Sequence, residues 1–136
     1  VVDEFQTFIK PIKTHPLSEF CKGLTTITQV EVDEAPGLEE AMGAFYEWIG
    51  NDEVWLSWGM YDKNQFVADH DLHGLSYLLP EHKNAKNLFS DAEGVNKKFG
   101  MFKALKRKGI ELEGTHHRGI DDARNLAKLL PYCGLV

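Results

Sequence analysis

The sequence has 136 residues, of which 43% are hydrophobic and 26% are charged, as expected for one globular domain. Its formal net charge of −6 argues against a histone-like protein that holds nucleic acid by bulk positive charge, but it is compatible with a local metal site. Cys21 and Cys133 form no spacing motif and no long apolar run occurs, so we expect a reduced, cytoplasmic setting without a membrane partner.

The first part of the chain predicts a strand, a short helical segment and an amphipathic helix. Partial alternation in residues 1–12 indicates a strand, and residues 17–32 predict a helical turn, broken by Gly23, and a connector. Residues 37–49 have the apolar stripe of a helix that packs on a core. Its members are Leu38, Met42, Phe45, Trp48 and Ile49.

Asp62 follows a predicted strand. Residues 53–58 (EVWLSW) are dense in aromatic and aliphatic side chains, which favours a strand buried inside a sheet, and residues 59–61 predict a turn. With Gln65 three positions on, Asp62 could cap the next helix. It could equally be a functional carboxylate, because open α/β sheets place their sites at the carboxyl ends of strands. One residue can do both.

The helix after Asp62 is expected to end near Gly74. It carries His70 and His73 at a spacing that could bind a metal, but no further cysteine or carboxylate motif completes such a site. We therefore favour a partly exposed helix face for both histidines. Residues 80–89 predict a loop.

A locally basic segment occupies residues 97–108 and predicts a helix that Gly109 ends. Cations near the C-terminus of a helix suit its dipole, so a solvated face is the preferred interpretation. Contact with the phosphates of a substrate is the alternative. Residues 110–113 predict a short strand.

Residues 114–127 combine a strand end, a glycine-bearing turn and the start of a helix expected over residues 121–130. Asp121 and Asp122 then lie at a helix N-terminus, where free N–H groups and the dipole favour carboxylates. With His117 on the turn, imidazole and carboxylate could share a metal-bound water, as base and ligand. In the alternative, Asp121 caps the helix and both neighbouring histidines are solvated.

Residues 114–125 (GTHHRGIDDARN) place His117 and Asp122 in an H-x-x-x-x-D pattern that resembles the last motif of the DEDDh (DnaQ-like) 3′→5′ exonucleases. The branch with histone-mRNA 3′ exonuclease and KapD-like sporulation inhibitors is the most similar. Residues 57–66 (SWGMYDKNQF) resemble the third acidic motif of this branch. The resemblance implies that His117 is the general base and that Asp62 and Asp122 are ligands of catalytic Mg²⁺ or Mn²⁺, two ions in the complete site.

One part of the family pattern is not found in this sequence. The family begins with a strand that carries Asp-x-Glu, followed by a second strand, and residues 32–34 (VDE) lie in a connector and do not match. The family sheet orders its strands 3-2-1-4-5, and the strands expected near Phe5, Val54 and Leu112 would be strands 3, 4 and 5. We therefore expect residues 1–136 to be the C-terminal part of a single exonuclease domain, inactive on their own.

The fold predicted from this resemblance is α/β, an RNase H-like (DnaQ-like exonuclease) mixed sheet flanked by helices and lacking its first two strands. The predicted function is metal-dependent 3′→5′ exonuclease activity, releasing nucleoside 5′-monophosphates from the 3′ ends of single-stranded RNA or DNA. Two alternatives are a non-catalytic exonuclease-like binding or regulatory module, and a structural protein whose His–Asp turn is only a cap. The sequence leaves the choice of RNA or DNA, the biological substrate and the oligomeric state open.

Overall fold

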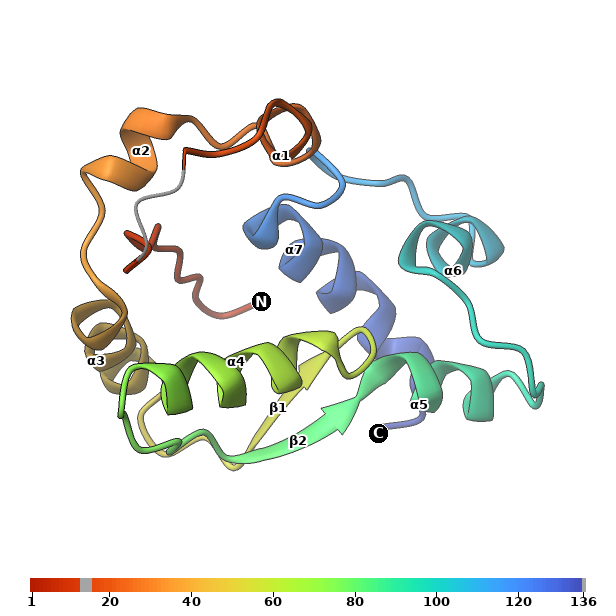
Figure 1. Ribbon diagram of the computed structural model, residues 1–136. Coiled ribbons are helices and arrows are strands. Elements are labelled where there is room, and N and C mark those ends of the chain that lie inside the picture. The colour runs from red at the N-terminus through yellow and green to blue at the C-terminus, as the bar shows by residue number, and fades with distance from the viewer. Residues whose placement is uncertain (13–15, 136) are drawn as a thin grey trace.

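The computed structural model describes residues 1–12 and 16–135. Figure 1 shows the N-terminal segment between α3 and α7, with the other elements arranged around it. The elements are α1 (Glu19–Thr25), α2 (Gln29–Asp33), α3 (Leu38–Ile49), β1 (Val54–Ser57), α4 (Tyr61–Leu72), β2 (Glu81–Asn84), α5 (Ala85–Ala92), α6 (Met101–Arg107) and α7 (Gly119–Leu129), followed by a 3-10 turn (Leu130–Tyr132).

The sheet pairs β1 with β2 in parallel, so that Val54 lies opposite Glu81 and Ser57 opposite Asn84. Parallel strands need a crossover connection, which α4 provides. The expected strand over residues 53–58 is confirmed, but the expected loop over residues 80–89 is wrong, because this segment forms β2 and α5. Since β2 reads Glu-His-Lys-Asn, it contains no apolar residue, and its strand character comes from pairing with β1.

Asn84 ends β2 and begins α5 with a single side-chain oxygen. Its Oδ1 accepts hydrogen bonds from the backbone N–H groups of Lys86 (3.1 Å) and Asn87 (3.3 Å), which caps α5. The same oxygen accepts the N–H of Gly59 at 3.1 Å, in the turn after β1. One side chain therefore holds together the turn before α4 and the start of α5.

Two of the expected strands, over residues 1–12 and 110–113, are wrong: both segments lie outside the regular elements. Glu113 instead makes both of its backbone hydrogen bonds to the buried side chain of Asn125 on α7. Its N–H donates to Oδ1 at 2.8 Å and its carbonyl accepts from Nδ2 at 3.0 Å. The amide thus satisfies polar groups that a neighbouring strand would otherwise pair. The idea that two central strands lie outside this sequence stays a prediction.

Helices expected from hydrophobic periodicity are mostly present. The helix expected over residues 37–49 is α3, and the one expected over residues 121–130 is α7, which begins two residues earlier. The helix predicted over residues 97–108 is α6 and begins only at Met101, while α1 continues through Gly23. None of the helices in the described part of the chain combines the length and apolar character needed to cross a membrane.

The main core lies between α5, α6 and α7. Phe89, at its centre, is fully buried and meets the ring of Phe99 edge-on at a centroid distance of 5.7 Å. The buried members of this core are Ala85, Phe89, Phe99, Met101, Ala104, Leu105, Leu129 and Cys133. Aromatic rings join the remaining elements: Phe5 packs 5.5 Å from Phe45, and Trp55 of β1 meets Phe66 of α4 edge-on at 5.4 Å.

Candidate active site

The turn before α7 depends on a close approach between Gly114 and Asp121. Gly114 has a positive φ of 66°, which glycine adopts without strain, and a Cβ atom there would overlap the carboxylate of Asp121. Asp121 is buried, with 9% of the residue exposed, and its carboxylate accepts the backbone N–H of Thr115 at 2.9 Å. This hydrogen bond, helped by Arg124, holds the pKa of Asp121 below its usual range. Asp121 therefore caps the turn and is not free to act as a ligand.

Arg124 fastens the same turn to the N-terminal segment. Its Nη1 donates to Oδ1 of Asp121 at 3.1 Å, while Nε and Nη2 donate to the two carboxylate oxygens of Glu4 at 3.0 and 2.9 Å. A guanidinium that binds a carboxylate through two parallel hydrogen bonds fixes orientation as well as distance. Residues 120 positions apart in sequence thereby support one turn.

His116, His117 and Asp122 form a cluster at the start of α7. Each offers one potential ligand atom, and these atoms all lie within 4.8 Å of one another. Oδ1 of Asp122 is 3.2 Å from Nδ1 of His116 and accepts the backbone N–H of His117 at the same distance. His117 has a φ of 73°, a left-handed conformation that is uncommon outside glycine and often found at functional sites.

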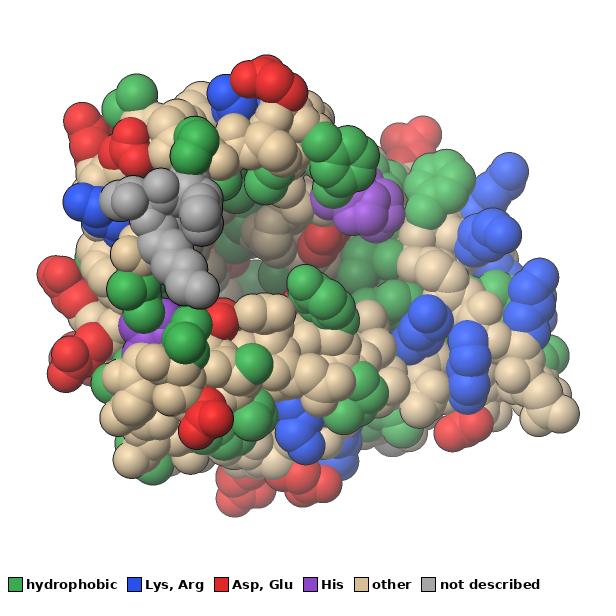
Figure 2. All heavy atoms as spheres, in the orientation of Figure 1, with side chains coloured by type: hydrophobic (Ala, Val, Ile, Leu, Met, Phe, Trp, Pro, Cys, Tyr) green, Lys and Arg blue, Asp and Glu red, His purple; other side chains and the backbone are tan. Residues whose placement is uncertain are grey.

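Asp62 reaches the same place from the first turn of α4. Asp62, His117 and Asp122 all line one cavity of about 720 Å³, and Figure 2 shows the hollowed face with histidine and acidic side chains at its margin. Asp62 is open to the solvent in this cavity, yet the surrounding walls displace enough water to raise its pKa. The negative charge of Asp122, which lines the same cavity, raises it further.

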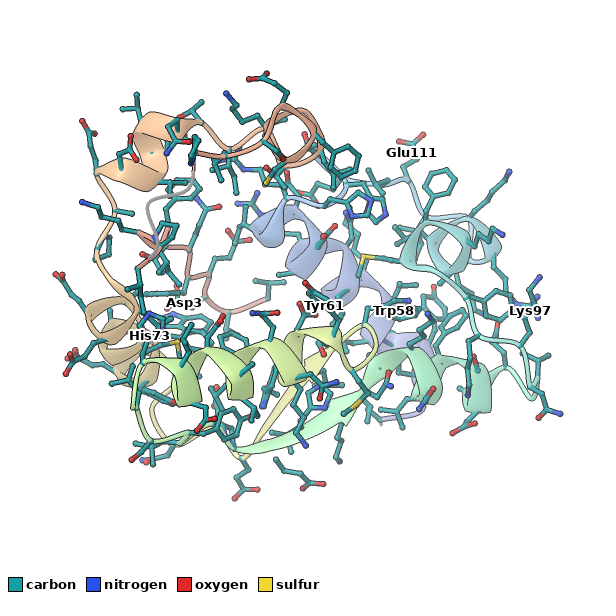
Figure 3. All side chains as sticks on the ribbon, viewed as in Figure 1. Asp3, Trp58, Tyr61, His73, Lys97 and Glu111 are labelled. Atoms are coloured by element: carbon teal, nitrogen blue, oxygen red, sulfur yellow. The ribbon has the colours of Figure 1, made fainter. Side chains whose placement is uncertain are left out.

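Apolar and aromatic side chains form most of the cavity wall. Its volume lies within the usual range for small-molecule sites, which combine apolar walls with a few converging polar groups. Figure 3 places Trp58 and Tyr61 at the end of α4 nearest to α7. Among the residues that line the cavity are Phe5, Phe8, Phe45, Trp55, Trp58, Phe66, Met101 and Leu126.

The structure thus brings together the three residues singled out from the sequence, although Asp62 and Asp122 are 60 positions apart. It adds His116, whose bond to Asp122 depends on the left-handed turn at His117. The adjacent histidines in the sequence were the available signal, but the family motif assigned a role only to His117.

The paired histidines of α4 are not a metal site. His70 is buried rather than partly exposed as expected: its Nδ1 donates to the Phe66 carbonyl at 2.6 Å and its Nε2 accepts from the Tyr46 hydroxyl at 2.9 Å. Both ring nitrogens are therefore occupied by the core. His73 lies half-buried, with Nδ1 2.8 Å from the Asp69 carbonyl.

Ser57 and His82 form a second polar pair, with Oγ and Nε2 2.7 Å apart. The Ser57 hydroxyl donates its hydrogen to the Gly59 carbonyl at 3.0 Å, so the imidazole N–H must donate to Oγ. An imidazole that donates to a hydroxyl does not activate it as a nucleophile. This pair therefore links β1 to β2 and offers no competing catalytic centre.

Comparison with known proteins finds exoribonucleases among the similar sequences. The chain is 28% identical over 143 residues to 3′-5′ exoribonuclease 1 of Rattus norvegicus, covering 95% of this chain and 41% of that protein. It is 31% identical over 152 residues to ERI1 exoribonuclease 3 of Bos taurus, covering 97% and 43%. The chain thus spans less than half the length of these curated relatives.

A solved structure supports the fold assignment. The nuclease domain of 3′hExo, a DEDDh family member bound to rAMP, superimposes with a TM-score of 0.87 at 24% identity, over 94% of this chain and 70% of that one. This likeness confirms the predicted DnaQ-like α/β fold. The RNase T family model, described as an exonuclease, matches residues 1–130. The chain therefore belongs to the RNase T exonuclease family.

Proposed function

We propose that the protein containing this chain is a divalent-metal-dependent 3′→5′ exonuclease that acts on single-stranded RNA or DNA ends. The observation that carries this proposal is the convergence of Asp62, His117 and Asp122 on one cavity. Two carboxylates and an imidazole are the groups that metal-assisted hydrolysis of a phosphodiester requires. The exoribonucleases among the similar proteins, and the 3′hExo nuclease domain bound to rAMP, support this assignment by similarity.

Asp62 and Asp122 fit the role of metal ligands. Carboxylate oxygens are the hard donors that Mg²⁺ and Mn²⁺ prefer, and a bound cation would offset the two effects that raise the pKa of Asp62, its desolvation and the negative charge of Asp122. When bound, two such ions supply positive charge that lowers the pKa of a water molecule and stabilises a leaving 3′ oxygen.

His117 is better placed than His116 to accept a proton from the attacking water. Its ring is exposed and makes no hydrogen bond to a side chain or carbonyl in the described part of the chain, whereas Nδ1 of His116 is engaged by Asp122. As water attacks, a new P–O bond forms, the bond to the 3′ oxygen breaks, and His117 takes the proton that the water loses. The product carries a 5′-phosphate.

The decisive experiment is an activity assay of the full-length protein on single-stranded RNA and DNA, with Mg²⁺ or Mn²⁺. We expect nucleoside 5′-monophosphates to be released from strands with a free 3′ hydroxyl, and none after chelation with EDTA. A matched strand with a blocked 3′ end is the control. If wild-type protein and the double variant Asp62→Asn/Asp122→Asn release nucleotides at the same rate, the proposal fails.

Residues 1–136 on their own should be inactive. Asp62 and Asp122 are the carboxylates among the residues that line the cavity, and two carboxylates cannot fill the roughly six ligand positions that each Mg²⁺ requires. Full Mn²⁺-dependent activity of a protein that consists of residues 1–136 alone would contradict this expectation. If the full-length protein binds metal and single strands but hydrolyses neither RNA nor DNA, the alternative of a non-catalytic binding module is favoured.

A further inference from the structure

A second charged feature lies at one end of the cavity. Residues 97–108 contain six of the fifteen lysines and arginines and none of the twenty-one acidic residues, in a chain whose net charge is −6. We call five of these cations, all exposed, the basic ridge: Lys97, Lys98, Lys103, Lys106 and Arg107. Figure 2 shows them as positive side chains gathered over α6 and the connection from α5.

Most of this positive charge is not neutralised locally. Glu93 forms ion pairs with Arg107 and Lys108, each at 2.8 Å. The four lysines of the ridge make no ion pair with any side chain in residues 1–12 or 16–135. The basic ridge therefore remains available to a polyanion.

The helix dipole does not account for this distribution. Lys106 and Arg107 occupy the last turn of α6, where positive charge is favourable. Lys103, however, lies in the first turn, and Lys97 and Lys98 precede the helix, where positive charge is unfavourable. A solvated face that merely stabilises α6 would carry its cations at one end.

Several contacts hold the ridge in place. The backbone carbonyl of Lys97 accepts from the buried Ser90 hydroxyl at 2.7 Å, and that of Phe99 accepts from Nε1 of Trp58 at 2.8 Å. The ring of Phe99 lies 5.6 Å from Nζ of Lys97 and 5.1 Å from Cζ of Arg107, within range of cation–π attraction. A preorganised charge loses less side-chain entropy when it binds.

The basic ridge also connects to the cavity. Gly100 and Met101 line the cavity together with Asp62 and Asp122, and Phe102, 55% exposed, follows them along α6. Figure 3 shows Lys97 at the opposite end, on the edge of the molecule formed by α5 and α6. Seven helical residues span about 10 Å, a length over which a stacked strand presents roughly three phosphates.

We propose that the basic ridge binds the sugar–phosphate backbone of the nucleic acid strand that leads to the 3′ end in the cavity. This inference rests on the proposed function, because the cavity supplies the position of the 3′ end. Exposed lysines neutralise phosphates without reading bases, so the ridge adds affinity and not sequence preference. The net negative charge of the chain then confines binding to this face.

The test uses the full-length protein and a 20-nucleotide single-stranded RNA labelled at its 5′ end, in EDTA so that nothing is cleaved. Fluorescence anisotropy between 50 and 200 mM salt gives the slope of log K against log salt. This slope is negative. The Lys103→Gln/Lys106→Gln variant should make it shallower by roughly 1.4, or about 0.7 per lysine for a single strand. At 0.1 M salt this equals up to about 25-fold weaker binding.

Two controls decide the outcome. Lys10→Gln/Lys83→Gln removes the same charge outside the ridge and should leave the slope unchanged. A trinucleotide, which has fewer phosphates to place on the ridge once its 3′ end is in the cavity, should lose less affinity in the ridge variant than the 20-mer does. Equal losses for both lengths, or equal slopes for both double variants, would overturn the proposal.

Binding and catalysis are measured separately, so the two proposals can fail independently. A normal salt dependence without cleavage of either RNA or DNA would disprove the exonuclease and leave the basic ridge in place. Metal-dependent cleavage, together with the same salt slope in wild type and in the ridge variant, would support the exonuclease and disprove the role of the basic ridge.

Discussion

The backbone N–H of His117 donates a 3.2 Å hydrogen bond to the carboxylate of Asp122, five residues further on. This bond closes the turn between the proposed base and the proposed ligand. It occupies one lobe of Oδ1 and holds the carboxylate beside the imidazole, at the start of α7. The backbone therefore fixes the position of the proposed base, His117, relative to the proposed ligand, Asp122.

Loss of Asp122 should remove activity through metal binding. Asp122→Asn keeps the shape of the side chain and its hydrogen-bond acceptor, but it takes away the charge that a divalent ion requires. We expect calorimetry to show much weaker Mn²⁺ binding together with loss of most nuclease activity. Comparable Mn²⁺ affinity in wild type and variant would remove Asp122 from the ligand set.

Replacement of His117 should separate catalysis from metal binding. His117→Ala should lower turnover by ~10²–10⁴-fold, the usual contribution of a general base, with Mn²⁺ affinity largely retained. His116→Ala is the matched control, because it removes a neighbouring imidazole that is already bonded to Asp122, and its effect should be smaller. If the His116 variant lost more turnover than the His117 variant, the assignment of the base would have to be exchanged.

Without metal, the pair of carboxylates should destabilise the fold at neutral pH. The pKa of Asp62 is raised, so the folded state holds its proton more tightly than the unfolded state does. The stabilisation from protonated Asp62 is present below the ordinary value of 3.8 and lost as pH rises through the raised pKa. In EDTA, Asp62→Asn should therefore be more stable than wild type above this window, and the difference should shrink as pH falls through it.

Urea unfolding at several pH values measures this effect. Asp122→Asn should also lower the pKa of Asp62, as followed by NMR, because it removes one of the two causes of the shift while burial remains. An unchanged Asp62 pKa in that variant would show that the two carboxylates do not interact.

Gly114→Ala should unfold the turn that carries the site. The positive φ disfavours alanine by roughly 1–2 kcal/mol, and its Cβ would in addition collide with the Asp121 carboxylate. Gly43→Ala is the control: it lies inside α3 with open space around it, and should stabilise by roughly 0.5–1 kcal/mol. Thermal unfolding that ranks the two variants in the opposite order would contradict the role given to Gly114.

Sequence patterns predicted those helices and strands whose conformation is set by neighbouring residues. The apolar stripe of α3 and the dense apolar run of β1 are properties of neighbouring residues, and both elements formed where expected. β2 could not be found this way, because its residues are polar and its conformation comes from pairing with β1. The same reason explains residues 110–113, where Asn125, twelve positions away from Glu113, takes the place of a strand partner.

The candidate site also combines a local part with a part that depends on the whole fold. The turn from Gly114 to Asp122 is local, so its glycine and its carboxylates could be read from the sequence. Asp62 and this turn line one cavity because of how the fold places α4 and α7, which no local pattern encodes, and only the resemblance to the family joined them. The role of Arg124 was missed because its partners, Glu4 and Asp121, are brought together by the fold.

The candidate site depends on Asn84, although Asn84 does not belong to it. Its side-chain oxygen touches neither carboxylate, yet it binds the N–H of Gly59, three residues before Asp62, while also starting α5. A replacement without an acceptor at that point would release two segments at once, whereas aspartate would keep the acceptor. Position 84 should therefore hold asparagine or aspartate among related sequences, and other residues there should disturb the proposed metal site from a distance.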